Sequence, residues 1–198
     1  MSLATDRPLV NLNRPAEVPS TPPGRPVETA ERLAFERWVE TLRPALIRLA
    51  YRYLWNAHDA EEIVQDAIAL AWREAATAAP GTEHGDAWLY RVVVNLSLNR
   101  LRRLKTEPLP PGEIKAASAE DSPAEVSELM QRVRLAIREL PDRQQAAIVL
   151  RDIEGLSYER LAVILETRAA TARVLVHRAR EAVRQILLSR WPDTFASP

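Results

Sequence analysis

Apolar residues recur every three or four positions along most of this 198-residue chain, and that spacing restricts it to helices. Glycine, which favours turns and irregular backbone, occurs only 5 times, and runs of β-branched residues are short and isolated. Hydrophobic residues make up 46% and charged residues 27%, the proportions of an ordinary globular protein. The sequence therefore predicts an all-α protein with a buried core.

The composition argues against several classes of function. The chain contains no cysteine, which excludes disulfides, cysteine-ligated zinc and thiol catalysis. Its histidines, His58, His84 and His177, are scattered, and the sequence has no Glu-x-x-His pattern of the ferritin-like metal proteins. There is also no glycine-rich phosphate loop or activated-nucleophile motif. We therefore expect no catalytic residues, no metal site and no cofactor.

The N-terminus and the apolar runs bear on location. The first residues lack a basic segment followed by an apolar one, so they do not form a secretory signal. The apolar runs are only a few residues long, far short of a membrane span. The sequence predicts a soluble, cytoplasmic protein without membrane insertion.

Composition also divides the chain into five segments. Six of the 15 prolines lie before residue 30, which predicts a disordered arm over residues 1–33. Helical periodicity marks residues 34–106 and 128–190 as two helical domains. Residues 107–127 are acidic and rich in proline, which predicts a flexible linker, and residues 191–198 form a tail.

Capping and breaking residues predict the helix ends in the first domain. Pro44 lies inside an apolar repeat and predicts a kink or two shorter helices. Asp59, followed by an acid three residues later, predicts a helix over Ala60–Ala76. Asp86 is the expected N-cap of a further helix that ends near Lys105.

The second domain has similar signals. Its first helix should start near Ser127 and stop at Pro141, and Asp142 should cap the next one. Gly155 should end that second helix, and Ser157 should cap a third. A fourth helix is expected over about Ala169–Ser189, after a short turn.

At 100° per residue, the helix that ends near Lys105 has two distinct sides. Its apolar side is expected in the core and comprises Leu89, Val93, Leu96 and Leu104. Its polar side should face outward and comprises Trp88, Arg91, Asn95, Asn99 and Arg102. An indole can stack on a base, amides can hydrogen-bond base edges, and arginines neutralise phosphates, so this stripe favours unpaired nucleic acid. The alternative is a solvated polar face with a half-buried tryptophan.

The Ala60–Ala76 helix presents a mixed face. Acids on its outward side surround apolar side chains, a pattern typical of a protein interface with a charged rim. The partner of such a face would be basic. The residues concerned are Glu61, Glu62, Gln65, Asp66, Ile68, Ala69 and Trp72. The alternative is that Trp72 packs under the first helix.

The last two predicted helices form a helix-turn-helix pattern. Ala172, Val176, Ala179, Val183 and Ile186 should pack inward. The opposite face of the last helix is basic and suits a DNA major groove with its phosphates. It comprises Thr171, Val174, His177 and Arg178, flanked by Arg173, Leu175 and Arg180. An ordinary helical hairpin is the alternative.

Three segments in this order resemble a known family. They are DAEEIVQDAIALAW, AWLYRVVVNLSLNRLRR and ELPDRQQAAIVLRDIEGLSYERLAVIL followed by HRAREAV. Together they are similar to the extracytoplasmic-function sigma factors of bacterial RNA polymerase, over about residues 35–187. The resemblance implies two small helical domains, a sigma region 2 bundle and a sigma region 4 helix-turn-helix, joined by a flexible linker.

The resemblance also implies partners and roles. The partners are core RNA polymerase, through its β′ clamp helices and β flap, and promoter DNA, while an anti-sigma factor is a further candidate. By match to the family, the clamp is contacted by Glu62, Gln65, Asp66 and Trp72. The melted −10 element is read by Asn95 and Asn99. The −35-reading helix carries Thr171, Arg173, Val174, His177 and Arg178. Trp88, Arg91 and Arg102 share the stripe of the two asparagines. The linker corresponds to the segment that runs toward the polymerase active centre.

The recognition helix departs from the family pattern. Where the family has Gly-Thr-Val-(Lys/Arg)-Ser-Arg, this chain has Ala170-Thr171-Ala172-Arg173-Val174-Leu175. Two alternatives remain beside a sigma factor: a helix-turn-helix regulator that binds duplex DNA without being a polymerase subunit, and a helical interaction module without DNA contact.

Overall fold

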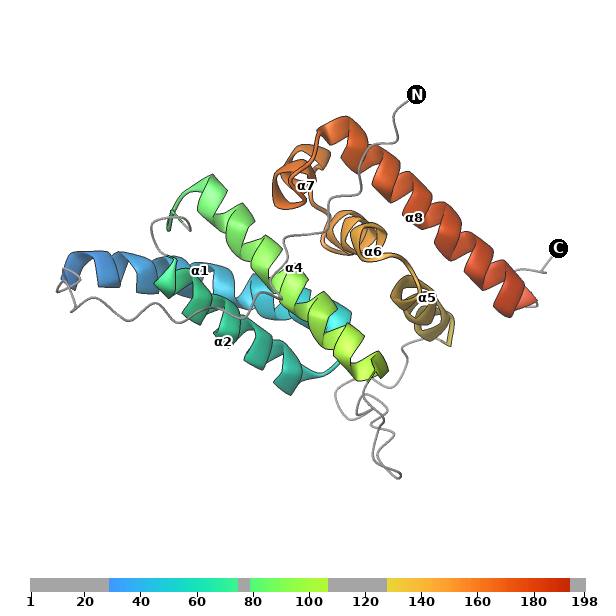
Figure 1. Cartoon of the computed structure of the whole chain (residues 1–198), viewed down its shortest axis with the longest axis horizontal. Helices are drawn as coiled ribbons and strands as arrows, with labels where there is room; N and C mark the ends of the chain where they lie inside the picture. The colour runs from blue at the N-terminus through green and yellow to red at the C-terminus, as the bar shows by residue number, and fades with distance from the viewer. Residues whose placement is uncertain (1–28, 75–78, 107–127, 193–198) are drawn as a thin grey trace.

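The computed structural model describes residues 29–74, 79–106 and 128–192, and every regular element in these ranges is helical. The predicted linker, nearly all of the predicted arm and most of the tail lie outside the described residues. The helices form two groups along the chain, and Figure 1 shows them side by side with α4 between the other helices of both groups.

The first group comprises α1 (Thr29–Leu54), α2 (Ala57–Arg73) and α4 (Glu83–Thr106), each packed against the other two. Of the two alternatives at Pro44, that of two shorter helices was wrong, because α1 is one helix that includes this residue, and the kink stays a prediction. Pro44 is exposed, while Trp38 before it and Leu46 after it are both buried. Burial of the same helix face on both sides of Pro44 keeps the segment helical despite one missing hydrogen bond.

Two of the predicted N-caps in this group were wrong. Helix α2 starts earlier, and the Asn56 side chain accepts a hydrogen bond from the backbone N–H of Asp59 at 3.0 Å. Helix α4 also starts earlier, and the Thr82 hydroxyl accepts a hydrogen bond from the backbone N–H of Gly85 at 3.0 Å. Asparagine and threonine are good capping residues, so an earlier cap was available in both places.

The two aspartates make tertiary contacts instead of capping. Asp86 accepts a hydrogen bond from the Trp38 indole at 2.6 Å, which ties α4 to α1. The Asp59 carboxylate accepts one from the Arg100 guanidinium at 2.6 Å, which ties α2 to α4. These contacts between distant residues explain why a purely local signal misplaced both helix starts.

The second group comprises α5 (Glu128–Arg138), α6 (Asp142–Ile148), the π-helical turn η2 (Val149–Ile153), α7 (Tyr158–Ile164) and α8 (Ala169–Arg190). Helix α8 is the longest of them and packs against α5, α6 and α7.

The helix ends of the second group follow the sequence signals with one exception. The Ser157 hydroxyl accepts a hydrogen bond from the backbone N–H of Arg160 at 3.1 Å, as predicted for a cap. Gly155 has φ of +72°, the left-handed conformation expected after a helix end. Asp142 is not a cap, because Pro141 holds that position and no side chain caps α6. The Asp142 carboxylate instead lies 3.7 Å from the Arg102 guanidinium of α4.

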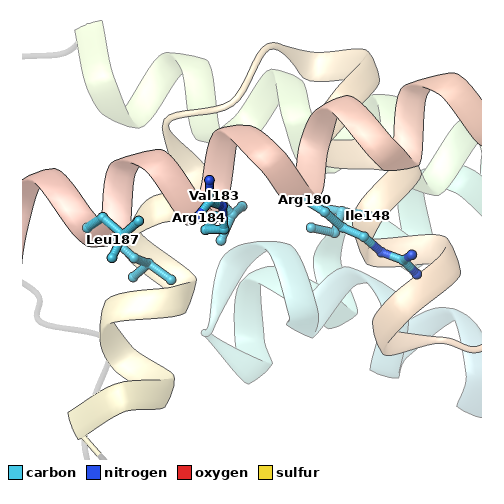
Figure 2. A pocket seen from close by; sticks show the side chains of 6 residues that line it. Ile148, Arg180, Val183, Arg184 and Leu187 are labelled. Carbon is cyan, nitrogen blue, oxygen red and sulfur yellow. The ribbon is translucent and has the colours of Figure 1, made fainter. Parts of the chain in front are cut away.

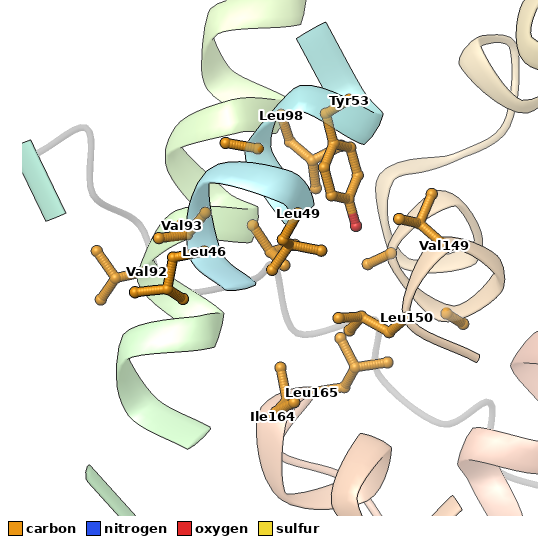
Figure 3. Packing of buried hydrophobic residues seen from close by; sticks show 14 of the residues in the cluster. Leu46, Leu49, Tyr53, Val92, Val93, Leu98, Val149, Leu150, Ile164 and Leu165 are labelled. Atoms are coloured by element: carbon orange, nitrogen blue, oxygen red, sulfur yellow. The ribbon is translucent and has the colours of Figure 1, made fainter. Parts of the chain in front are cut away.

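Buried apolar residues of both groups belong to one continuous cluster. Helix α4 contacts α7 in addition to α1 and α2, so the two groups share a packed boundary. Figure 3 shows this boundary, with Leu49 and Tyr53 of α1 facing Val149, Leu150 and Leu165.

Substitution at two leucines of α1 should separate core packing from helix propensity. Leu46 is 0% exposed and Leu33 is 50% exposed. We expect Leu46→Ala to lower the free energy of unfolding by about 2–5 kcal/mol, because it removes buried methyl groups and leaves a cavity. Leu33→Ala should change it by less than about 0.5 kcal/mol. Urea unfolding, monitored by circular dichroism, gives both free energies of unfolding. If the two variants lower the free energy of unfolding equally, the placement of Leu46 in the core is contradicted.

Candidate nucleic-acid interface

The outward face of α8 is exposed to solvent. All five residues assigned to it from the sequence are exposed, namely Thr171, Arg173, Val174, His177 and Arg178. On the opposite side Ala172, Val176 and Ala179 are buried, as the periodicity predicts. Ser157 caps α7 at the start of the preceding helix, and Glu166 in the turn before α8 has φ of +48°. The two helices and their turn thus form a helix-turn-helix with an exposed second helix.

A small cluster supports Arg173 at the start of this face. Its guanidinium lies 5.1 Å from the ring centroid of Tyr158 and 3.4 Å from the Glu159 carboxylate. Both contacts come from α7, so the first helix of the motif orients a basic side chain of the second. Such an arginine can exchange its exposed carboxylate partner for a DNA phosphate.

The polar stripe of α4 is not open in the same way. Asn95 is only 7% exposed, and its Oδ1 atom has no hydrogen-bond partner among the described residues. The sequence placed it on an outward face, and that part of the prediction was wrong. Helical periodicity gives the direction of a side chain from its own helix axis but does not show that a second group of helices packs against that side.

Charged residues of the stripe are paired with the second group of helices. Arg91 forms an ion pair with Glu166, in the turn before α8, and Arg102 lies 3.7 Å from Asp142 of α6. Asn99 accepts a hydrogen bond from Arg102. Trp88 is half-buried and packs against the core. At the other edge of α4, Leu104 is 39% exposed instead of buried as predicted, while Leu89 and Val93 are buried.

Further contacts join the two groups beside the stripe. Arg52 of α1 lies 3.7 Å from Glu154, and Arg160 of α7 lies 3.3 Å from Glu83 and 3.7 Å from Asp86 of α4. The Arg134 guanidinium of α5 lies 3.4 Å from the ring centroid of Trp55, in the loop after α1. Sequence reasoning missed the acids Asp142, Glu154 and Glu166, because each is separated from its partner by a long stretch of chain.

The mixed face of α2 is open. Glu62, Gln65 and Asp66 are exposed, and Trp72 is 41% exposed. The Trp72 ring also packs edge-on against Phe35 of α1, with 5.0 Å between ring centroids. Trp72 therefore agrees in part with both alternatives, an interface residue and a residue packed under the first helix. It packs against α1 and still presents its other side to solvent.

An apolar groove lies along the C-terminal half of α8, next to α6. It has a volume of about 430 Å³ and is lined by Ile148, Arg180, Val183, Arg184, Leu187 and Leu188. Figure 2 shows Leu187, Val183 and Arg180 along one side of α8, with Ile148 of α6 beside Arg180. Arg180 is held at the groove edge by two hydrogen bonds to the Asp152 carboxylate, at 2.8 and 2.6 Å, which raise the pKa of its guanidinium.

The described ranges contain no group of three or more metal-ligating side chains. None of the helices within these ranges combines the length and apolar character needed to cross a membrane. The chemistry of the exposed faces is that of recognition: acids with an aromatic residue on α2, and arginines with short side chains on α8. A helix-turn-helix whose exposed second helix is basic defines a helical DNA-binding protein.

Comparison with known proteins identifies the family. The Sigma-70 region 2 model matches residues 38–107, and the Sigma-70 region 4 model matches residues 130–183. The chain is 34% identical to the ECF RNA polymerase sigma factor SigE of Mycolicibacterium smegmatis, over 85% of this chain and 68% of that protein. It is 32% identical to the ECF RNA polymerase sigma-E factor of Escherichia coli, over 79% of this chain and 88% of that protein. The chain belongs to the extracytoplasmic-function family of RNA polymerase sigma factors.

A solved structure shares the fold. It is the sigma factor RpoE of Bartonella quintana in complex with the anti-sigma factor NepR, with a TM-score of 0.55 and 24% identity. The match covers 77% of this chain and 96% of that chain. As a sigma factor, the protein is an initiation subunit of RNA polymerase that directs promoter recognition. The region 2 match does not favour the alternative of a helix-turn-helix regulator outside the polymerase.

The boundary between the two groups predicts an alkaline loss of stability. Tyr53 is 1% exposed, its hydroxyl lacks a partner in the described ranges, and burial followed by the charge of Glu154 raises its pKa. A raised pKa in the folded state gives stability that is complete below the unfolded pKa, about 10, and decreases as the pH rises above it. Urea midpoints at pH 8 and above pH 10 should therefore diverge in the wild type.

Tyr53→Phe should reduce this divergence, because it removes the ionisable hydroxyl. At pH 8 its free energy of unfolding should stay within about 1 kcal/mol of the wild type, because the hydroxyl makes no hydrogen bond to a described residue that would be lost. Tyr51→Phe, on the same helix, leaves Tyr53 in place and should keep the alkaline loss. An alkaline loss of wild-type size in Tyr53→Phe would show that Tyr53 is not its source.

Proposed function

We propose that this sigma factor uses three surfaces, one each on α2, α4 and α8, and that residues 34–106 and 128–190 act as two domains linked by residues 107–127. The observation that carries the proposal is that the α2 and α8 faces are exposed while the opposite sides of both helices are buried. Both faces also lie within the segments matched by the region 2 and region 4 models.

The α2 surface would bind the β′ clamp helices of core polymerase. Glu62, Gln65 and Asp66 offer charge and hydrogen bonds, and the exposed side of Trp72 offers an apolar anchor. Acids on this face complement a basic partner and increase the rate of encounter. For the β flap, the apolar groove between α8 and α6 is a suitable surface, because its lining is mostly aliphatic.

The α4 surface would bind the melted −10 strand. Trp88 would stack on an unpaired base, Asn95 and Asn99 would hydrogen-bond base edges, and Arg91 and Arg102 would neutralise phosphates. The Oδ1 atom of Asn95, which has no hydrogen-bond partner among the described residues, supports this assignment. A buried acceptor without a donor is unfavourable in the folded protein, and a base amino group would supply the missing donor.

The α8 surface would read the −35 element. Arg173, His177 and Arg178 can contact phosphates and guanine, and the Thr171 hydroxyl can contact a base or a phosphate. Val174 is 47% exposed and donates no hydrogen bond, but its methyl groups can pack against thymine methyls. The readout would therefore favour T-rich steps and depend strongly on phosphate contacts.

The remaining roles follow from membership of this family. The protein would be a non-enzymatic factor that acts in the cytoplasm, where core polymerase and promoter DNA are found. An anti-sigma factor is a candidate partner, because the Bartonella quintana protein of the same fold is in complex with one.

The clamp assignment can be tested by substituting two polar residues of the α2 surface. We expect Asp66→Asn combined with Gln65→Ala to weaken binding to core polymerase about tenfold, because two polar contacts are lost at the interface. Glu40→Gln on α1 is the matched control, since Glu40 is exposed and lies outside the proposed surface. Native-gel titration measures the binding and circular dichroism checks helicity. Normal binding by the double variant would refute the assignment.

The −35 assignment can be tested by sequence selection. Val174→Ser restores a hydroxyl at the position where the family has serine, so it should shift the selected −35 sequence without loss of fold. The control is Val163→Ser, because Val163 of α7 is similarly exposed at 44% and lies outside the proposed surface. Holoenzymes made with each variant select from a randomised −35 library. Identical sequence logos for wild type and Val174→Ser would mean that this helix face does not read bases.

A further inference from the structure

We propose that the region 4 helices act as an internal cover of the −10 surface, in which Glu166 and Asp142 take the places of DNA phosphates on Arg91 and Arg102. This inference rests on the proposed −10 role of α4. In the free chain the two matched regions would then be closed on each other, and the −10 surface would be released only when they separate.

The geometry of α4 supports the cover. One stripe of α4 carries Arg91, Asn95 and Arg102. Asn95 lies about one helical turn after Arg91, and Arg102 lies about two turns after Asn95. Both arginines are paired with carboxylates that come from the second group of helices. Asn95 lies between the two arginines and is only 7% exposed. Two of the side chains that would bind the strand, Arg91 and Arg102, are therefore paired with the second group, and a third, Asn95, is buried.

Beside the stripe, the ion pairs across this boundary join arginines of region 2 to acids of region 4. Region 2 contributes Arg52, Arg91 and Arg102, and region 4 contributes their partners Glu154, Glu166 and Asp142. A carboxylate and a phosphate present similar oxygen acceptors to a guanidinium, so the acids can compete directly with a strand. Arg160 of region 4 forms two ion pairs of the opposite sense, one with Glu83 and one with Asp86 of region 2.

The cover is selective. The Glu62, Gln65 and Asp66 face of α2 and the outward face of α8 both remain exposed in the closed arrangement. The closed chain can therefore still present its proposed clamp and −35 surfaces while its −10 surface is blocked. Binding of polymerase and −35 DNA to these open faces can separate the regions, provided that they bind the separated state more tightly.

The test uses the full chain and two sets of substitutions matched in charge. The opening set is Asp142→Asn, Glu154→Gln and Glu166→Gln, which removes the acids facing region 2. The control set is Glu128→Gln, Glu139→Gln and Glu181→Gln, which removes three acids paired within region 4 to Arg132, Arg190 and Arg184. Both sets change the net charge equally, so a general gain in DNA affinity affects them alike.

Two measurements are made on each free protein. Because the chain has no cysteine, Ala57→Cys and Ser189→Cys give specific dye sites on exposed positions of α2 and α8 for energy transfer. Strand capture is measured with a single-stranded oligonucleotide that carries the −10 sequence selected by the wild-type holoenzyme. The opening set should lower the energy transfer and tighten strand binding roughly tenfold relative to the control set, because several partly exposed ion pairs are lost.

The outcomes separate the cover from the −10 role itself. Equal energy transfer and equal strand binding in the two sets would overturn the cover. Holoenzyme with Asn95→Ala tests the −10 role independently on duplex and premelted templates. If its −10 preference changes while the opening set gains nothing, only the cover is wrong. If its −10 preference is unchanged, the −10 role is wrong and the cover falls with it.

Discussion

The burial of α4 on two sides is the constraint on which the rest of this structure depends. Its Asp86 carboxylate binds the Trp38 indole of α1, and its Arg100 guanidinium binds Asp59 of α2. On the other side Arg91 binds Glu166, and apolar residues of both regions meet around Leu49 and Leu150 (Figure 3). Because one helix contacts both groups, its polar residues cannot all remain in water, and tertiary packing decides which ones are covered.

Electrostatics explains how a chain with equal numbers of acids and bases can bind both polymerase and DNA. It has 27 of each, but they are distributed unevenly over its surfaces. Acids dominate the open face of α2, arginines dominate the open face of α8, and the boundary between the regions pairs one set with the other. The net charge of zero therefore counts arginines that are paired with acids across the boundary. When the regions separate, these arginines can exchange their carboxylate partners for DNA phosphates.

Local signals predicted the helices well and their starts less well. Ser157 caps α7 as predicted, because its hydroxyl accepts a hydrogen bond from the backbone N–H of Arg160 in the first turn. Asp59 and Asp86 failed as caps, because Asn56 and Thr82 lie a few residues earlier and long-range partners hold both carboxylates. The π-helical turn at Val149–Ile153 had no signal in the sequence pattern.

The sequence by itself determined the helical class, the buried sides of α2 and α8, and the family, because periodicity and motif order are properties of the chain alone. Only the tertiary structure decided that Asn95 is buried, that Leu104 is exposed, and that Glu166 and Asp142 face the arginines of α4. The physical reason is that a helical repeat gives the direction of each side chain around its own axis. What lies in that direction depends on the packing of helices distant in sequence, to which no local pattern responds.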